Sequence, residues 1–378
     1  MPVMHLCLKC KGRLMCGRER CLFSLPVPRV LEELRATPPS IFVGRTGYPK
    51  VFAGPLLSPA ENPEYFDSPW EWSGKVEDVV AVRMKVARGM KLVDARAASN
   101  PDRYLSELQE AVASVSHLDV EANFSGIVWR PKIDGIAKPA GISVRLEDFK
   151  VTENPKIPAK VEKIHYDELK ASDSIYLLFR SGFRTYYIQK LLSAGMLGEE
   201  RNRKLVPTRW SITAVHDTLA ERLKSEIAEF PEVNDVLLFE YEHFGNRFSI
   251  VIYPSKFSFK LYELWRKGAV WSGDTWIGFD SETLLRKKKY SILSGGYYAA
   301  RLPVLEYLRT VRRQAGAIVF REITPEYTAP LGVWVVEEGV RKAMNSKPKK
   351  FDSLSEALRR ARTSVPGKFF RQTSIFEF

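Results

Sequence analysis

Residues 236–253 read V-L-L-F-E-Y-E-H-F-G-N-R-F-S-I-V-I-Y, and this pattern indicates which class of fold the chain adopts. Two runs rich in β-forming residues, 236–242 and 247–253, flank the pair Gly245-Asn246. Such a pair favours a tight turn between neighbouring antiparallel strands. The stretch therefore predicts a β-hairpin.

Helices and strands alternate irregularly around this hairpin. Apolar residues four apart over 214–230 predict a helix, and so do cap and proline signals at Asn100, Pro303 and Ser353-x-x-Glu356. The expected helices are 101–115, 214–230, 303–314 and 354–362. The expected strands outside the hairpin are 79–86, 174–180, 317–323 and 331–337. Because no strict βαβ repetition is present, we expect an α+β or mixed α/β fold.

The length and composition indicate a globular protein with a two-domain body. The chain has 378 residues, of which 45% are hydrophobic and 27% charged, so it can bury a sizeable core. The expected divisions are 1–25, 26–258, 259–365 and a flexible tail, 366–378. No run is long and apolar enough for a membrane span or a secretory signal, which predicts a cytoplasmic protein without a membrane partner.

All four cysteines lie in the first 21 residues, with the spacing C-x2-C-x5-C-x4-C. Short loops with Gly12 and Gly17 allow four thiolates to surround one ion, and nearby Lys and Arg residues favour the thiolate form. The pattern predicts a small structural zinc module. An iron–sulfur cluster and unligated cysteines are the alternatives. The expected ligands are Cys7, Cys10, Cys16 and Cys21.

The charge balance favours a polyanionic partner. Lys plus Arg total 58 against 45 Asp plus Glu, a net charge of +13, which suits DNA. When bound to DNA, the protein would be associated with the nucleoid. Basic residues gather over 341–371 and in two shorter groups, which are either phosphate contacts or solvated surface. These two groups are Arg286, Lys287, Lys288 and Lys289, and Arg309, Arg312 and Arg313.

Three further patterns suggest functional sites, but each pattern is a less specific sequence signal. The first pattern lies close to an expected helix start, where the helix dipole favours anions, and consists of Arg209, His216 and Asp217. These residues are candidates for a phosphate or nucleotide pocket, or for a catalytic group. The loop Gly44-Arg45-Thr46-Gly47 is either a phosphate-backbone contact or an ordinary turn. Asp280 and Glu282 follow an apolar run, as in the first motif of metal-dependent exonucleases, but the further aspartates of such a site are missing. The sequence leaves open whether the chain is an enzyme.

The last seven residues resemble the peptides that bind the DNA polymerase sliding clamp (PCNA). These peptides have the form Q-x-x-h-x-x-aromatic-aromatic, where h is an aliphatic residue. Their aliphatic and aromatic side chains project from one 3₁₀ turn and fill an apolar groove of the clamp. Gln372, Ile375 and Phe378 match this spacing; a second aromatic residue after Phe378 is missing, and Phe376 is the expected substitute. The alternative is a tail that docks on its own domain. The expected clamp-binding residues are Gln372, Thr373, Ser374, Ile375, Phe376, Glu377 and Phe378.

Four segments together resemble the Nre family of archaeal DNA repair proteins. They are the cysteine run at residues 7–21, R-K-L-V-P-T-R-W-S-I-T-A-V-H-D at 203–217, G-G-Y-Y-A-A-R-L-P-V-L-E-Y-L at 295–308, and Q-T-S-I-F-E-F at 372–378. The resemblance implies a four-cysteine zinc finger, a clamp-binding motif, Nre N- and C-terminal domains, and DNA damage repair through the clamp. It implies no catalytic mechanism. The expected function is thus a repair factor that binds DNA and the clamp; the alternative is a metal-dependent DNA nuclease or phosphoesterase.

Overall fold

The computed structural model describes residues 10, 14–15, 19, 21–23, 34–128 and 133–361. The described chain divides into two compact units. Among the described residues, the N-terminal unit extends to Leu219 and includes Ala329–Trp334, and the C-terminal unit comprises Ala220–Thr328 and 335–361. The division falls inside the long helix α8 (Thr208–Ile227). The expected boundary at 258/259 coincides with the start of a strand of the C-terminal unit.

The N-terminal unit is built on a six-stranded sheet in the order β1-β5-β6-β4-β3-β2. β4 and β6 are parallel, and the other neighbours are antiparallel. Gly89 in β4 allows Leu146 of the neighbouring β6 to pack closely against it, because a Cβ at position 89 would lie 2.5 Å from Leu146 Cδ1. The strands are β1 (Ala36–Thr37), β2 (Ile41–Val43), β3 (Lys50–Leu57), β4 (Ala87–Asp94), β5 (Leu118–Val128) and β6 (Ser143–Val151).

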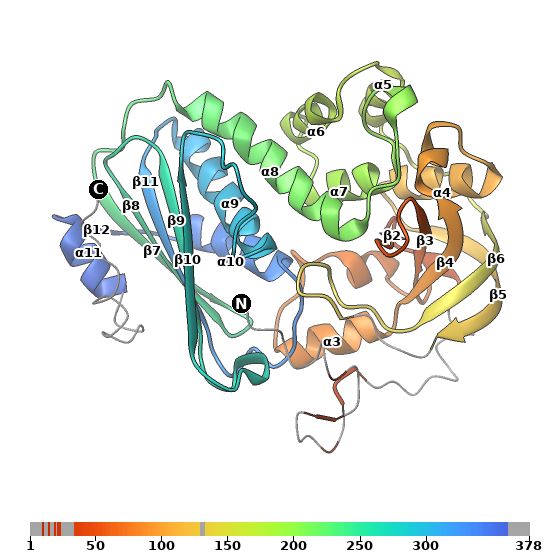
Figure 1. Ribbon diagram of the computed structural model, residues 1–378, viewed down its shortest axis with the longest axis horizontal. Helices are drawn as coiled ribbons and strands as arrows, with labels where there is room; N and C mark the ends of the chain where they lie inside the picture. The colour runs from red at the N-terminus through yellow and green to blue at the C-terminus, as the bar shows by residue number, and fades with distance from the viewer. Residues whose placement is uncertain are drawn as a thin grey trace. The chain divides into compact units, whose positions relative to one another are not determined.

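Helices surround this sheet, and α4 packs against it through Tyr104, whose hydroxyl donates to the Ala53 carbonyl at 2.9 Å. Asp102 caps α4 by accepting from the Leu105 amide, so the helix begins two residues later than predicted. Before α8 the unit contains α3 (Val76–Met84), α4 (Arg103–Ala113), α5 (Ala159–Tyr166), α6 (Ala171–Arg180) and α7 (Thr185–Ser193), with short 3₁₀ turns at Pro63–Asp67, Ala95–Ser99 and Glu200–Asn202 (Figure 1).

The C-terminal unit has a second six-stranded sheet, in the order β10-β9-β11-β8-β7-β12. Only β11 and β9 are parallel neighbours in it. Its strands are β7 (Val236–His243), β8 (Asn246–Tyr253), β9 (Ser258–Trp265), β10 (Trp276–Thr283), β11 (Gly316–Ile323) and β12 (Lys349–Phe351), and a 3₁₀ turn, Ala269–Trp271, precedes β10.

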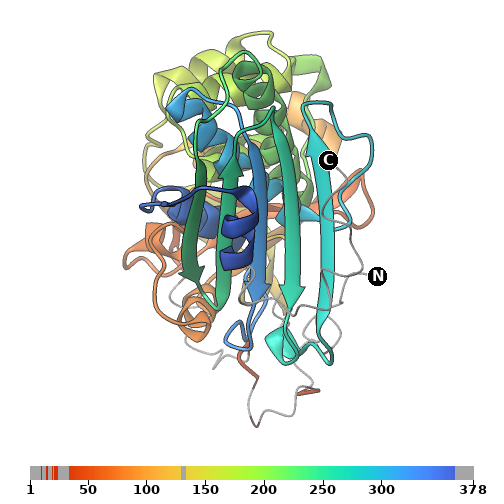
Figure 2. The same ribbon diagram turned by 90° about the vertical axis from the view of Figure 1, so that its left-hand side faces the viewer.

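Helices cover both faces of this sheet. α11 (Leu354–Ala361) packs on one face through Leu358, beside Tyr262 and Ile318, and stands in front of the strands in Figure 2. α9 (Gly295–Val311) lies on the other face, where the Tyr297 ring contacts Phe259, and α10 (Trp334–Met344) follows in sequence after β11. The sheet is therefore the middle layer of this unit.

The clearest local signals are confirmed. The hairpin forms as β7 and β8, but its turn is Phe244-Gly245, because Asn246 already pairs with His243. The helix predicted over 214–230 is the C-terminal part of α8, which ends at Ile227, and β11 matches the strand predicted at 317–323. Ser353 caps the start of α11, because its Oγ accepts the Glu356 amide at 3.2 Å, which is one of the two bonds of the predicted capping box. The fold is a mixture of α and β structure, as predicted.

Three predicted strands are helices instead. Residues 79–86 belong largely to α3, 174–180 to α6, and 331–337 enter α10. In α6 the buried residues Ser174, Ile175 and Leu178 have helical spacing, and packing overrides the β propensity of the segment. Residues 331–340 are buried on all sides, so the segment has no periodicity that distinguishes strand from helix. α9 also begins at Gly295 rather than Pro303, because burial holds the helix together across the proline.

Two predicted features lie largely outside the described residues. Of the cysteine module, Cys10 and Cys21 are described, whereas Cys7 and Cys16 are not. The tail and the clamp motif at 372–378 are not described. None of the described helices is both long and apolar enough to cross a membrane.

Candidate functional site

The N-terminal unit contains a cavity of about 500 Å³, which we call the N-unit cavity. Its lining comes from four segments that are far apart in the sequence: 40–56, 67–90, Val128 with 133–143, and 207–212. Five basic side chains line it against two carboxylates, an excess of three positive charges. They are Arg45, Arg83, Arg88, Lys138 and Arg209, against Asp67 and Asp134.

Arg88 is the most unusual residue in this cavity. It is 7% exposed, yet no described carboxylate pairs with its guanidinium. One terminal nitrogen donates to Ser143 Oγ, the group stacks 4.6 Å from the Phe42 ring centroid, and Nε has no described hydrogen-bond partner. Burial, with the neighbouring Arg83, lowers the pKa of Arg88 to about 10, so it remains a buried cation at neutral pH.

Asp67 compensates two other cations of the cavity. Its Oδ1 lies 3.0 Å from Arg83 and 2.8 Å from Lys138 Nζ. Burial raises the pKa of the Asp67 carboxyl, but Lys138 and Arg83 outweigh that effect and lower it to about 2. Arg83 also donates to the Phe66 and Pro139 carbonyls. Because this carboxylate is shared between two cations, it leaves Arg88 uncompensated.

Arg209 reaches the cavity from the first turn of α8. It forms an ion pair with Asp134 at 3.2 Å, and Asp134 Oδ1 accepts the Ile136 amide at 2.7 Å. Thr208 Oγ1 accepts the Val43 amide at 2.9 Å and ties the helix start to β2. The positive end of the α8 dipole therefore borders the cavity.

The structure separates Arg209 from the other two residues predicted beside it. His216 is buried against α7, 3.2 Å from Gln189 Nε2, and does not line the cavity. Asp217 is half-buried and does not line it either. By contrast, Gly44, Arg45 and Thr46 of the G-R-T-G loop do line it.

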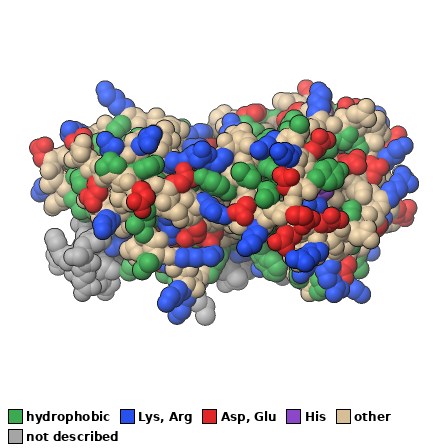
Figure 3. Space-filling view, turned by 90° about the horizontal axis from the view of Figure 1, so that it is seen from above, with side chains coloured by type: hydrophobic (Ala, Val, Ile, Leu, Met, Phe, Trp, Pro, Cys, Tyr) green, Lys and Arg blue, Asp and Glu red, His purple; other side chains and the backbone are tan. Residues whose placement is uncertain are grey.

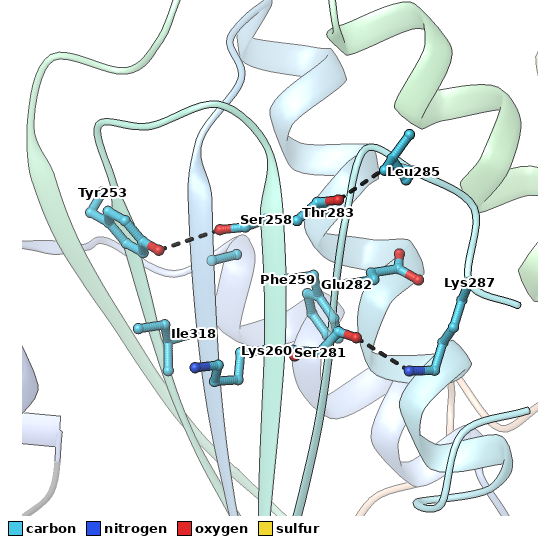
Figure 4. A pocket seen from close by; sticks show the side chains of 11 residues that line it. Tyr253, Ser258, Phe259, Lys260, Ser281, Glu282, Thr283, Leu285, Lys287 and Ile318 are labelled. Atoms are coloured by element: carbon cyan, nitrogen blue, oxygen red, sulfur yellow. Dashed lines mark hydrogen bonds between the residues drawn. The ribbon is translucent and has the colours of Figure 1, made fainter. Parts of the chain in front are cut away.

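A second hollow of about 440 Å³, the sheet pocket, lies at β9 and β10 of the C-terminal unit. Figure 4 shows Glu282 and Lys287 on one side of β9, and Tyr253, Lys260 and Ile318 on the other. The Lys287 ammonium donates to the Ser281 carbonyl at 3.2 Å, and burial lowers the pKa of Lys260. The charged groups of this pocket are thus not gathered around one point.

The carboxylates of β10 are both ion-paired. Glu282 accepts two hydrogen bonds of 2.7 Å from the fully buried Arg301 and lies 3.6 Å from Lys224. Asp280 pairs with Lys287 at 2.5 Å. Arg301 belongs to the G-G-Y-Y-A-A-R segment, which here supplies a buried ionic cluster. Among the described residues, no group of three His, Cys, Asp or Glu side chains is placed to hold a metal ion.

The predicted DNA contacts differ in their exposure and in their neighbours. Lys287 pairs with Asp280, Arg309 with Glu226 at 2.9 Å, Arg312 lies over the Phe230 ring, and Arg313 is half-buried. In the loop between β10 and α9, Arg286, Lys288 and Lys289 are exposed. The same loop exposes apolar side chains, which are Leu285 at 80%, Ile292 at 63% and Tyr290 at 55%. We call residues 284–292 the basic loop.

Charge elsewhere on the surface is mixed. Figure 3 shows Lys and Arg interspersed with Asp and Glu over the face in view. Of the basic cluster at 341–371, Arg341 pairs with Glu337 and Glu338, and Lys350 with Asp235. The net charge of +13 therefore does not by itself locate a binding surface. A binding surface has to be located from local clusters of basic residues.

Sequence reasoning missed Arg88 and Asp67. Both are charged residues surrounded by apolar or proline-rich sequence, and nothing in their neighbourhood marks them as neighbours in space. For Arg88 the one available signal is a charged residue directly after the apolar Val86 and Ala87, at the buried start of β4.

Comparison with known proteins covers nearly the whole chain. The family models "Archaeal Nre, N-terminal" and "Archaeal Nre, C-terminal" match residues 27–272 and 282–376. The chain is 49% identical to DNA repair protein NreA of Archaeoglobus fulgidus over 98% of both chains. It is 37% identical to DNA repair protein NreB of the same organism, over 93% of this chain and 91% of that one. For NreA of Haloferax volcanii the identity is 34%, over 90% and 87%. No solved structure matches.

Proposed function

Because the chain belongs to the archaeal Nre family, we propose that it is a DNA repair protein that binds DNA and is recruited to the DNA polymerase sliding clamp. The repair role is supported by the relatives, which are named DNA repair proteins and match along almost their entire length. DNA binding and clamp recruitment rest on different parts of the chain, so each part has its own test.

The basic loop is the observation that carries the DNA-binding part of the proposal. Exposed cations attract phosphates, and exposed apolar or aromatic side chains can insert between or stack on bases. Arg286, Lys288 and Lys289 provide the first kind of contact, and Leu285 and Tyr290 the second. Exposed lysine or a single exposed leucine is common in solvated loops, but here Leu285, Tyr290 and Ile292 are all exposed in the same basic loop.

Replacing Arg286, Lys288 and Lys289 together with alanine is expected to weaken binding to duplex DNA. Each lost phosphate contact removes about one unit of slope in log affinity against log salt, so the slope should fall by about 2 to 3. Fluorescence anisotropy with a labelled duplex at several salt concentrations measures this slope.

A charge-matched control is available in the N-terminal unit. Lys160, Lys163 and Lys170 are exposed on or beside α5, and their triple alanine variant removes the same charge elsewhere. This control should retain the wild-type slope. Equal slopes for the two triple variants would show that the basic loop has no special role in DNA binding.

The clamp part of the proposal rests on the terminal peptide. Gln372, Ile375 and Phe378 have the spacing of clamp ligands, and a tether of this kind raises the local concentration of the protein at DNA that carries a clamp. The expected result of deleting the peptide is given in the Discussion.

We further propose that the four cysteines bind a structural zinc ion. The donor set fits, because four cysteine sulfurs are a ligand set typical of structural zinc sites. Of these, Cys10 is buried and its sulfur accepts the Met15 amide at 3.3 Å. Cys7, Cys10, Cys16 and Cys21 would hold the ion and cross-link the N-terminal segment.

Changing Cys10 to serine is expected to abolish stoichiometric zinc binding, because a structural site closes with four ligands. Elemental analysis of the purified full chain should give one zinc per chain for the wild type and much less for Cys10→Ser. No cysteine follows residue 21, so thiol reagents that release zinc report on this module alone. Stoichiometric iron with visible absorbance would instead indicate an iron–sulfur cluster.

A further inference from the structure

We propose that the N-unit cavity binds a nucleotide, with Arg88 and Ser143 holding its phosphate and the apolar wall holding its base. This inference deepens the proposed function by assigning a nucleotide-binding site, yet it rests on a different unit and different residues from the basic loop. It is therefore tested independently of DNA binding by that loop.

The first step of the argument is the uncompensated charge of Arg88. Burying a guanidinium is costly unless an anion or several acceptors surround it. In the described structure its partners are one hydroxyl and one aromatic face, and Nε has none. A phosphate would supply the missing charge and accept from the free donors, in the forked geometry that arginine favours.

The second step is that the carboxylates of the cavity are already occupied. Asp67 serves Arg83 and Lys138, and Asp134 serves Arg209 and the Ile136 amide. An entering anion therefore meets an excess of positive charge, partly shielded from water. The positive end of α8 adds to this attraction.

The third step concerns the rest of the ligand. The volume of about 500 Å³ lies in the range of small-molecule pockets, about 300–1,000 Å³, and far exceeds what inorganic phosphate needs. Much of the wall is apolar: Ile41, Phe42, Val43, Phe52, Met90 and Ile212. Phe52 is 42% exposed and offers a ring face for stacking. A phosphate joined to a planar, partly apolar group is the chemistry of a nucleotide.

The nucleotide has two possible sources, a free monophosphate or the end of a DNA strand. Tyr48 and Trp210, both partly exposed, form a ring pair with centroids 5.5 Å apart, and Trp210 follows the cavity residue Arg209 in sequence. Such a pair could stack on the next base of a strand. Both sources present the same phosphate group to Arg88, and the calorimetry described next distinguishes them.

Calorimetry with the full chain tests the proposal. The probes are inorganic phosphate, deoxyadenosine, deoxyadenosine 5′-monophosphate (dAMP), and a ten-nucleotide thymidine strand with either a 5′-phosphate or a 5′-hydroxyl. We expect dAMP to bind more tightly than phosphate or deoxyadenosine alone. Tighter binding of the 5′-phosphorylated strand than of dAMP indicates a strand end, and binding of dAMP alone indicates a free nucleotide. If neither phosphorylated probe binds, the proposal is wrong.

The variant Arg88→Met separates ligand binding from a structural role. It should weaken binding of the phosphorylated probes about 10- to 100-fold, the usual effect of losing a hydrogen bond to a charged group. Since no anionic group among the described residues pairs with Arg88, the melting temperature of the variant should stay the same or rise. Arg88→Lys should retain part of the affinity. The control Arg96→Met removes an exposed arginine of the same unit that does not line the cavity.

Two results would overturn the assignment of Arg88. One is a folded Arg88→Met protein that binds dAMP like the wild type. The other is a marked fall in its melting temperature, which would make Arg88 a structural residue. The basic-loop triple variant should bind dAMP normally, so failure of the DNA-binding proposal would leave this result unchanged.

Discussion

Replacing Asp67 with asparagine is expected to lower the free energy of unfolding by about 3–5 kcal/mol. The substitution leaves Arg83, a buried side chain, and Lys138 without their shared carboxylate. An uncompensated charge in a protein interior costs far more than an exposed ion pair contributes. Urea unfolding followed by tryptophan fluorescence measures the change, because Trp72 lies 5.8 Å from the Arg83 guanidinium.

The same carboxylate makes stability depend on pH in the acid range. The pKa of Asp67 is about 2 in the folded protein against an ordinary value of 3.8. A lowered carboxyl pKa stabilises the folded state above the unfolded-state pKa, and this stabilisation is lost as the pH falls through 3.8 toward 2. It amounts to roughly 2 kcal/mol. In Asp67→Asn this part of the acid dependence should be missing.

The matched control for Asp67→Asn is Asp94→Asn. Asp94 pairs with Arg96 at 2.6 Å in the same unit, but both side chains are solvent-accessible. Asparagine keeps the ability to accept the Arg96 amide, so unfolding should be little affected. If both variants unfold like the wild type, the buried carboxylate does not hold Arg83 and Lys138 as inferred.

Deletion of residues 372–378 is expected to abolish detectable binding to the sliding clamp while leaving the fold and the DNA affinity intact. Clamp ligands bind through a few side chains in pockets, so losing Gln372, Ile375 and Phe378 together removes most of the binding energy. Titration of the purified clamp with the full and the shortened chain in a calorimeter measures the difference. Duplex DNA binding, which the proposal assigns to the basic loop, should remain.

Single substitutions sharpen this test. Phe378→Ala removes a predicted anchor and should reduce clamp affinity by at least about tenfold, whereas Ser374→Ala changes a position between anchors and should have little effect. Clamp affinity that survives the deletion would refute the motif. It would favour the alternative in which the tail docks on its own domain.

Elements with strong local signals were predicted correctly, for a common physical reason. The β7–β8 hairpin, the apolar spacing in α8 and the Ser353 cap each involve residues close in sequence, so their energetics can be inferred without the rest of the fold. The hairpin turn itself is Phe244-Gly245, one residue before the predicted Gly245-Asn246 pair. α3, α6 and α10 were predicted as strands because β-forming residues in short windows do not reveal which neighbours will bury them.

The candidate sites divide in the same way. The basic loop is contiguous, so its charges were identified from the sequence, but only the structure separates exposed Lys288 and Lys289 from the ion-paired Lys287. Arg209 was identified from its place near a helix start, together with His216, which the structure buries elsewhere against α7. The two residues are seven apart, so they lie on nearly the same face of α8 but about 10 Å apart along its axis, where each has different neighbours.

The sequence by itself was enough to predict the mixed fold class, the family resemblance, the cysteine module and the clamp motif. Each of these predictions depends on residue types at short spacings. The tertiary structure decided which charges are compensated. Arg88 comes from β4, Ser143 from β6, Asp67 from a 3₁₀ turn and Arg209 from α8, and their meeting depends on sheet order and packing across more than 100 residues. Charge compensation depends on distance and burial in space, and these follow from the whole fold.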